Sequence, residues 1–502
     1  MTIRTVHIRV LIVLICLSLF SGRPSHARTI DFSLQEAVNI ALENSYQIKR
    51  LELGIERSKY YLKARESGLK SKVSLTVKSP EMKALSDYKW NSTIQRDEII
   101  REDTLRWQSD LSVRQPLIFF GYPTNGYLSL NNTLYQYNQK FEIKNDETNY
   151  YSRFFFRFDQ PLLQANYLKN NLERAEIDLE QYELNFINDR AWLIDRTSYR
   201  YYNLFAMSYK NNIGEYYVKS LEKVEEIVNR ISEDDSTRAI EKIQVQVELS
   251  NIREKLLENQ SDLRLEMARV KQDLRIDPED SLDVKTDADI IPVTVDLNRA
   301  LQYGYNLRPT LRLHDLSRRE LEIYHNETKL RGAFHLDLSF TYGLEKQDRE
   351  YYGLWEDTDN SYSVSIRAYI PIWDWGRRKS NTAAVQTYLK ENVIWVEESR
   401  SSIRSEITNG IKSLEEYKLR ALAMQENMKV SKELSAASLK HYEENNISTQ
   451  DILKTLERNM ETELSFLEAY LGYKKSLIRL MVNTHYDYEN QITLIDKLEK
   501  GI

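Results

Sequence analysis

The hydrophobic pattern changes its period within the stretch 361–379, which reads SYSVSIRAYIPIWDWGRRK. Up to Ile370, apolar side chains alternate with serine and arginine, which is the two-residue period of a strand with one apolar and one polar face. Pro371 cannot donate to a sheet ladder and Gly376 permits a tight turn, so the strand is expected to end there. A helical period follows from about residue 377 to 444. The stretch therefore predicts a strand, a proline joint and a long helix.

A second joint of this kind lies at 150–175, which reads YYSRFFFRFDQPLLQANYLKNNLERA. Here too a two-residue alternation precedes a proline, Pro161, and a helical pattern follows. One face of this predicted strand is aromatic and the other is charged, with Phe154, Phe156 and Phe158 on the first and Arg153, Arg157 and Asp159 on the second. The chain is therefore expected to make the strand-to-helix joint twice.

Helical patterns occupy most of the remaining chain and recur in the same order. Ser33 is a good N-cap for a helix of roughly 34 residues, and the helix after Pro161 has about 65 residues, or about 100 Å. The segment 277–296 has no helical period and predicts a linker. The order of short helix, strands, long helix and return helix then repeats. We therefore expect two internal structural repeats, at 28–296 and 297–502.

The clearest strands number four per chain, and the segment between the first two of them is long. This segment, 79–149, contains two further candidate strands and is expected to form external loops or an extra hairpin. Four strands cannot close a barrel, and open edges are not tolerated in lipid. Three copies would supply about twelve strands, so membrane insertion would require oligomerisation. The four strands lie near 73–77, 153–159, 335–344 and 361–370.

The N-terminus has the pattern of a secretory signal. Arg4 and Arg9 precede the apolar run 10–20, and small residues stand at the cleavage positions before the cut expected after Ala27. The chain's one cysteine, Cys16, lies within this segment, so thiol chemistry is not expected in the mature protein.

Composition narrows the function classes further. The 14 glycines and 9 prolines in 502 residues are few for loop-rich domains and fit long helices. A net charge of −6 without a basic block argues against a nucleic-acid partner. The seven histidines show no paired ligand spacing, and no glycine-rich phosphate loop is present. We therefore assign no catalytic, metal-binding or cofactor-binding residue and do not expect an enzyme.

Several motifs resemble the TolC family of outer-membrane efflux proteins over nearly the whole mature chain. They are a leucine- and alanine-rich helix at the start of each half, the Asn306–Pro309 segment, the Pro371–Arg378 joint, and EKIQVQVEL at 241–249. The resemblance implies a mainly α fold, with a long α-helical barrel across the periplasm and a trimeric transmembrane β-barrel in the outer membrane of a Gram-negative cell. It also implies a periplasmic adaptor (membrane fusion) protein and an inner-membrane transporter as partners.

The resemblance further implies that helix-turn-helix tips form a closable periplasmic aperture. These tips fall at Asp234 and Asp235 in the first half and at Asn445 and Asn446 in the second. Asn445 replaces the family's tip glycine, and asparagine tolerates the left-handed conformation.

Two acids match positions that line this aperture in the family, Asp451 and Glu241. Three copies of such an acid would form a cation-attracting ring. The other interpretation of Asp451 is an acid that stabilises the first turn of a helix, and the family's second acid is replaced by Lys454.

The three arginines of the strands, Arg153, Arg157 and Arg367, would face the barrel lumen, or else lie on the solvated face of a soluble sheet. The leading functional hypothesis is a passive exit duct of a tripartite efflux or type I secretion system. The alternative is a periplasmic coiled-coil scaffold or adaptor without a channel. The exported substrate, whether drug, metal or protein, is left open.

Overall fold

The computed structural model describes residues 28–91, 95–141, 147–232 and 239–496 and divides into two compact units. The helical unit comprises the chain up to Arg50, Asn185–Pro309, and the chain from Ser399 onward. The sheet unit comprises Leu51–Leu184 and Thr310–Glu398. Each unit combines segments from both sequence repeats, whose boundary at 296 stays a prediction.

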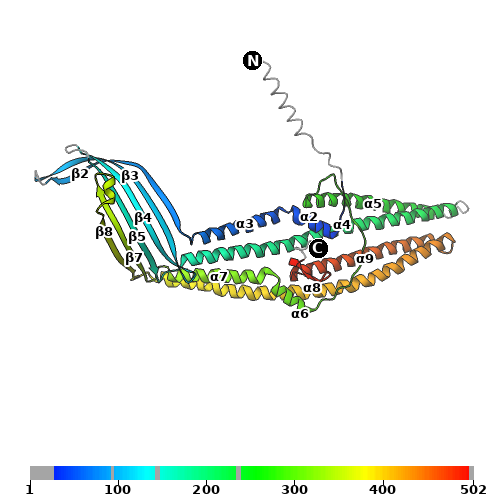
Figure 1. The fold of residues 1–502 in the computed structure, drawn as a ribbon. Coiled ribbons are helices and arrows are strands. Elements are labelled where there is room, and N and C mark those ends of the chain that lie inside the picture. The colour runs from blue at the N-terminus through cyan, green and yellow to red at the C-terminus, as the bar shows by residue number, and fades with distance from the viewer. Residues whose placement is uncertain (1–27, 92–94, 142–146, 233–238, 497–502) are drawn as a thin grey trace, which may run out of the picture. The chain divides into compact units, whose positions relative to one another are not determined.

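Among its described residues, the sheet unit contains one antiparallel sheet of six strands, in which every strand pairs with the next strand of this sheet along the chain (Figure 1). Of the two alternatives for the segment 79–149, the extra hairpin is confirmed, so the described residues supply six strands to this sheet and not only the four of the clearest sequence patterns. The strands are β2 (Lys72–Asn91), β3 (Arg96–Phe119), β4 (Tyr122–Phe141), β5 (Glu147–Leu162), β7 (His335–Asp348) and β8 (Asp359–Tyr369).

The β2 strand is far longer than the alternation at 73–77 indicates. Pro80 lies where the register with β3 shifts between Lys78 and Glu81, and this irregularity interrupts the two-residue pattern. Beyond it the strand continues to Asn91. The sequence pattern therefore located β2 but ended it too early.

The strand register separates an apolar face of the sheet from a polar face. Ile366 pairs with Leu338, while the neighbouring Ser365 pairs with Ser339 on the other face. The apolar face is solvent-exposed in the single chain: Ile366 is 70% exposed and Val73 66%. Across the six strands the apolar face carries Val73, Leu75, Val77, Leu111, Val113, Leu128, Leu130, Leu134, Phe154, Phe156, Phe158, Leu336, Leu338, Phe340, Tyr342, Tyr362, Val364 and Ile366.

Two long helices continue from the sheet, α4 (Tyr167–Ser232) after β5 and α8 (Arg377–Glu443) after β8. Both match the helices predicted after the proline joints. The sheet unit also contains α7 (Pro309–Leu330) and most of α3 (Tyr46–Ser67).

A buried ion pair holds α4 against α7. Glu327 is 4% exposed, and both its oxygens accept hydrogen bonds from Arg174, at 2.8 and 3.0 Å. Asn170 donates a third hydrogen bond to Oε1 at 2.8 Å. Burial acts to raise the pKa of Glu327, but the hydrogen bonds from Arg174 and Asn170 outweigh it and hold the pKa below its ordinary value. The carboxylate is therefore charged and paired at neutral pH.

The helical unit packs its core among segments of α2 (Leu34–Asn44), α4, α5 (Ala239–Leu274) and α9 (Thr449–Thr484). Its large buried side chains include Phe32 of the N-terminal segment, Phe205 of α4 and Phe466 of α9. Two small sheets complete the unit, one of β1 (Thr29–Asp31) with β6 (Ser281–Asp283) and the other of β9 (Tyr486–Asp487) with β10 (Ile492–Thr493). Among the described residues, no helix combines the length and apolarity that a bilayer span requires.

Each predicted short helix is divided in two. The first breaks at Ser45, which has an extended backbone and caps α2, before α3 begins at Tyr46. The second breaks after α6 (Leu297–Asn306), because Pro309 restricts the preceding residue and begins α7. The predicted linker at 277–296 contains β6 but no helix.

Candidate functional site

The tips of the long helices come together in the helical unit. The ends of α4 and α8 pack against the starts of α5 and α9 around an apolar cluster. This cluster consists of Tyr217, Val218, Leu221, Val224, Ile227, Val228, Val245, Leu249, Ile252, Tyr442, Ile452 and Leu456. Asp234 and Asp235, predicted for the first tip, lie outside the described residues.

The second tip is a tight turn between α8 and α9. Asn445 has φ +61°, the left-handed conformation expected for it from the sequence. The N–H of Asn446 donates to the carbonyl of His441 at 2.9 Å, which closes the end of α8 as a C-cap. Ser448 then caps α9 by accepting a hydrogen bond from the N–H of Asp451 at 3.2 Å. Local hydrogen bonds therefore define the conformation of the turn.

The two predicted aperture acids lie at the starts of neighbouring helices. Asp451 is exposed in the first turn of α9, and its carboxylate accepts the Ser448 hydroxyl at 2.7 Å. Glu241, in the first turn of α5, accepts the hydroxyl of Thr449 at 2.5 Å. The structure thus links Glu241 to Thr449, which precedes Asp451 by two residues in α9.

Sequence reasoning missed Thr449 and Tyr442, which complete this link. Both are 2% exposed, and their hydroxyls lie 2.9 Å apart. Because Thr449 donates to Glu241, Tyr442 must donate to Thr449. The hydrogen-bond chain Tyr442, Thr449 and Glu241 therefore fastens α8, α9 and α5 at the tips. Its only sequence signal is Ser448-Thr449 at a helix start, where one hydroxyl caps and the other is free to bond elsewhere.

The three predicted lumen-facing arginines all lie on the polar face of the sheet. Arg157 is ion-paired with Asp159 on its own strand at 2.9 Å, and Arg153 with Glu345 on β7 at 3.1 Å. Arg367 stands opposite Asp337 in the register. The polar face thus carries paired charges of both signs.

Another cation of the polar face, Arg114 on β3, was not singled out from the sequence. Its guanidinium lies 3.6 Å from the ring centroid of Tyr127 on β4. The same two-residue alternation that marked the other arginines continues through β3 and would have identified it. The residues aligned with Arg114 by register on the six successive strands are Lys72, Arg114 itself, Ser129, Arg157, Thr341 and Ser363.

The two strand-to-helix joints differ in detail. After β8, Pro371 and Gly376 lie in a turn where Gly376 has φ +78°. Asp374 accepts hydrogen bonds from the N–H groups of Arg378 and Gly376, which lowers the pKa of its carboxyl and caps α8. Before α4, Pro161 lies inside β5 and not after it, because the strand continues to Leu162. Proline is accepted at this strand end because the ladder hydrogen bonds are about to stop.

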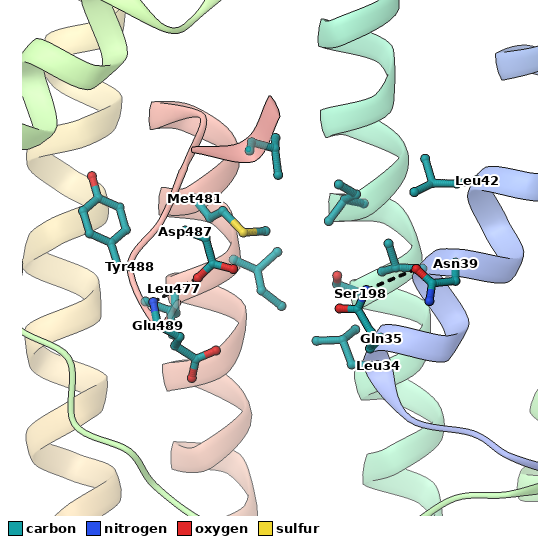
Figure 2. A pocket seen from close by; sticks show the side chains of 14 residues that line it. Leu34, Gln35, Asn39, Leu42, Ser198, Leu477, Met481, Asp487, Tyr488 and Glu489 are labelled. Carbon is teal, nitrogen blue, oxygen red and sulfur yellow. Dashed lines mark hydrogen bonds between the residues drawn. The ribbon is translucent and has the colours of Figure 1, made fainter. Parts of the chain in front are cut away.

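A small cavity of about 80 Å³ lies among α2, α4 and α9 in the helical unit (Figure 2). Gln35 donates to Asn39 across one turn of α2 at 3.1 Å, and Asp487 accepts the N–H of Glu489 at 2.9 Å. These polar groups bond to one another and not into the cavity, so we interpret it as a packing gap. Within the described ranges, no group of three or more histidine, cysteine or acidic side chains is placed to hold a metal ion.

No protein-family model and no curated protein matches this chain. Solved structures do. The outer-membrane channel CmeC of Campylobacter jejuni is 13% identical, with 93% of this chain and 89% of CmeC covered and a TM-score of 0.64. CusC, in which conformational changes accompany folding and transmembrane channel formation, is 13% identical, with 93% and 95% covered and a TM-score of 0.62. The outer-membrane protein VceC of Vibrio cholerae is 12% identical, with 90% and 95% covered and a TM-score of 0.60. The chain therefore has the fold of the TolC-like outer-membrane channels, as its motifs predicted.

Proposed function

We propose that this protein is an outer-membrane exit duct, through which solutes leave an inner-membrane transporter for the exterior. The observation that carries this proposal is the apolar face of the sheet, which spans all six strands and is exposed in the single chain. A face of this size facing water would make the protein aggregate, whereas lipid would cover it favourably.

The sheet also has two open edges, β2 and β8. Unpaired N–H and C=O groups are costly in hydrocarbon, so the β8 edge of one copy would pair with the β2 edge of the next until a barrel closes. The CmeC channel and the protein VceC, whose folds this chain shares, are described as outer-membrane proteins. We therefore propose a homotrimer with its strands in outer-membrane lipid.

The long helices suit a periplasmic conduit. α4 and α8 have 66 and 67 residues, and each begins at a strand-to-helix joint. Their hairpin tips would form the aperture and contact a periplasmic adaptor protein that connects to the transporter. The alternative, a periplasmic scaffold without a channel, does not account for an exposed apolar sheet face. No observation favours drugs, metals or secreted proteins as the cargo.

The experiment that tests this proposal measures oligomeric mass and conductance together. The protein would be purified in detergent, weighed by native mass spectrometry and reconstituted into a planar bilayer. We expect a mass of three chains and stable ion conductance. A stable monomer without conductance would refute the duct and leave the scaffold.

Asp451→Asn should lower the cation preference of the reconstituted channel. Three carboxylates about 10 Å from a passing cation contribute roughly 0.4 kcal/mol each in water, which alters the cation-to-anion ratio severalfold before salt screening. Asparagine can still accept the Ser448 hydroxyl, so the cap of α9 is kept. Reversal potentials in a salt gradient give the ratio.

The matched control for this variant is Glu461→Gln, which removes an exposed acid from the same helix away from the tip. This control should leave the reversal potential unchanged. If Asp451→Asn also leaves it unchanged, Asp451 acts only at the start of α9.

A further inference from the structure

The β3–β4 hairpin is built into the sheet between β2 and β5. Its two strands are joined by a tight turn at Phe120 and Gly121, both with positive φ, +48° and +82°. β3 pairs with β2 from Arg96 to Arg114, and β4 pairs with β5 from Tyr127 to Gln139. Without this hairpin the chain would supply the four strands that its clearest sequence patterns predict.

We propose that this hairpin widens the duct, so that three copies close an eighteen-stranded barrel whose bore admits bulky hydrophilic solutes. This inference rests on the proposed function, since it assumes the trimeric barrel. Beyond the proposed function, the inference states how large a solute can pass through the membrane-spanning barrel.

Both faces of the hairpin match the rest of the sheet, which places it in the wall. On the apolar face, Val113 pairs with Val73 on one side and Leu130 on the other. On the polar face, the Ser112 hydroxyl donates to the Asn131 side chain at 2.5 Å. A hairpin folded into the lumen as a plug would lose the pairing of β3 with β2 and of β4 with β5. It would also expose its apolar face to water. The hairpin therefore adds circumference and does not narrow the bore.

The turn region of the hairpin is fastened to the joint between β5 and α4. Asn125 donates to the carbonyl of Ala165 at 3.2 Å, and Asn166 donates to that of Pro123 at 2.5 Å. Gln160 exchanges hydrogen bonds with Thr124 through its amide nitrogen and oxygen, each at 3.0 Å. These bonds fasten the turn end of the hairpin to the wall.

The gain in width follows from strand number. Barrel diameter grows about linearly with strand number, so eighteen strands give a barrel about 1.5-fold wider than twelve. With strands ~4.8 Å apart and tilted ~40°, the backbone radius is about 18 Å, against about 12 Å for twelve strands. If side chains fill about 5 Å at the wall, the free radius is about 13 Å against about 7 Å. Barrels of this strand number leave an aqueous channel.

The lining points to hydrophilic solutes. The polar face carries serines and threonines between the ion pairs of Arg153 with Glu345 and Arg157 with Asp159. Because this face carries charges of both signs, the lining does not select strongly for one sign. Size and water solubility would then decide which solutes pass the barrel.

The test uses graded thiol reagents on cells that carry Ser363→Cys in the full-length protein. Ser363 is exposed on the polar face of β8, and the chain's one native cysteine, Cys16, precedes the expected cleavage site. Reagents added outside enter through the barrel mouth, so the result does not depend on the helical tips. We expect labelling by maleimide–polyethylene glycol of about 10 Å radius, which an eighteen-stranded bore admits and a twelve-stranded bore excludes.

Val364→Cys is the matched control, because it is the next residue and lies on the apolar face. It should remain unlabelled by every hydrophilic reagent. If Ser363→Cys reacts with a small maleimide but not with the 10 Å reagent, the wide bore is refuted and the duct stands. If Ser363→Cys does not react with any reagent, or Val364→Cys reacts equally well, the duct itself is refuted.

A second variant deletes residues 96–141 in the Ser363→Cys background. β2 and β5 remain antiparallel after this deletion, so a four-stranded sheet retains its up-and-down order. The radius of the largest reagent that labels Ser363→Cys should fall by about 1.5-fold or more relative to the full chain. An unchanged cut-off in a deletion variant that still forms trimers would overturn the proposal. If the deletion variant does not assemble, the labelling of the full-length Ser363→Cys protein by the 10 Å reagent decides between the wide and the narrow bore.

Discussion

Ile366→Asp is expected to abolish assembly in the membrane, whereas Ser365→Asp should leave it intact. Ile366 is 70% exposed on the apolar face, beside Leu338 of β7. Its side chain would meet lipid, where the substitution places a carboxylate in each of three copies. The cost at mid-membrane is about 2–4 kcal/mol for a basic residue and less for an acid, so Ile366→Arg should be more severe still.

Ser365 is the control because it is the preceding residue on the same strand and points to the other face. Its neighbour across the ladder is Ser339, within a surface that already carries charged groups. The measurement is the amount of trimer in outer-membrane fractions for each variant. Equal assembly of Ile366→Asp and Ser365→Asp would show that the apolar face does not meet lipid.

The sequence predicted most of the strand faces because alternation is a local property. In β7 and β8 the period of two is unbroken, in β5 Phe155 departs from it, and the observed register agrees with each predicted face. For the segment 79–149 the sequence left two alternatives, external loops or an extra hairpin. It did not decide between them because polar residues interrupt the apolar face of the hairpin at Ser109 and Asn132. Its membership of the sheet depends on pairing with β2 and β5, which no local pattern specifies.

Helix lengths were predictable for a similar reason, and helix breaks were not. α4 and α8 end within a few residues of their expected positions, because the apolar spacing stops at polar clusters. The break between α2 and α3 lies at Ser45, and serine can stand either at a helix cap or in a helix interior. Only its extended backbone distinguishes the two. The pattern alone therefore joined α2 to α3.

At the tips, the sequence identified the residues but not their bonds. Asn445 was recognised because few residues adopt positive φ readily. The hydrogen bond of Thr449 to Glu241 joins residues 208 positions apart, so it appears only once the helices are packed together. The aperture role of Asp451 and Glu241 is still a prediction.

Glu327→Gln is expected to lower the free energy of unfolding by about 3 kcal/mol at neutral pH. The substitution leaves the Arg174 guanidinium, which donates both of its hydrogen bonds to Glu327, without a countercharge. Removing one partner of a buried ion pair costs about 3–5 kcal/mol, and Arg174 is partly exposed, which places the value at the lower end. Thermal unfolding of the purified protein, followed by helical circular dichroism, gives the change.

The effect should depend on pH in one direction. Because the folded pKa of Glu327 lies below its ordinary value of 4.5, its stabilising contribution is complete above that value. It is lost as pH falls through the folded pKa, where the wild-type carboxyl also becomes neutral. The difference between wild type and Glu327→Gln should therefore be constant from about pH 6 to 8 and shrink below about pH 4.

Glu322→Gln on the same helix is the control, because Glu322 forms only exposed ion pairs with Arg318 and Arg319. Such pairs contribute about 0–1 kcal/mol, so this variant should unfold close to wild type. A Glu327→Gln protein as stable as Glu322→Gln at pH 7 would show that the buried pair does not hold α7 to α4. In that case the apolar contacts of Ile177 with Leu316 and Ile323 would be sufficient to join the two helices.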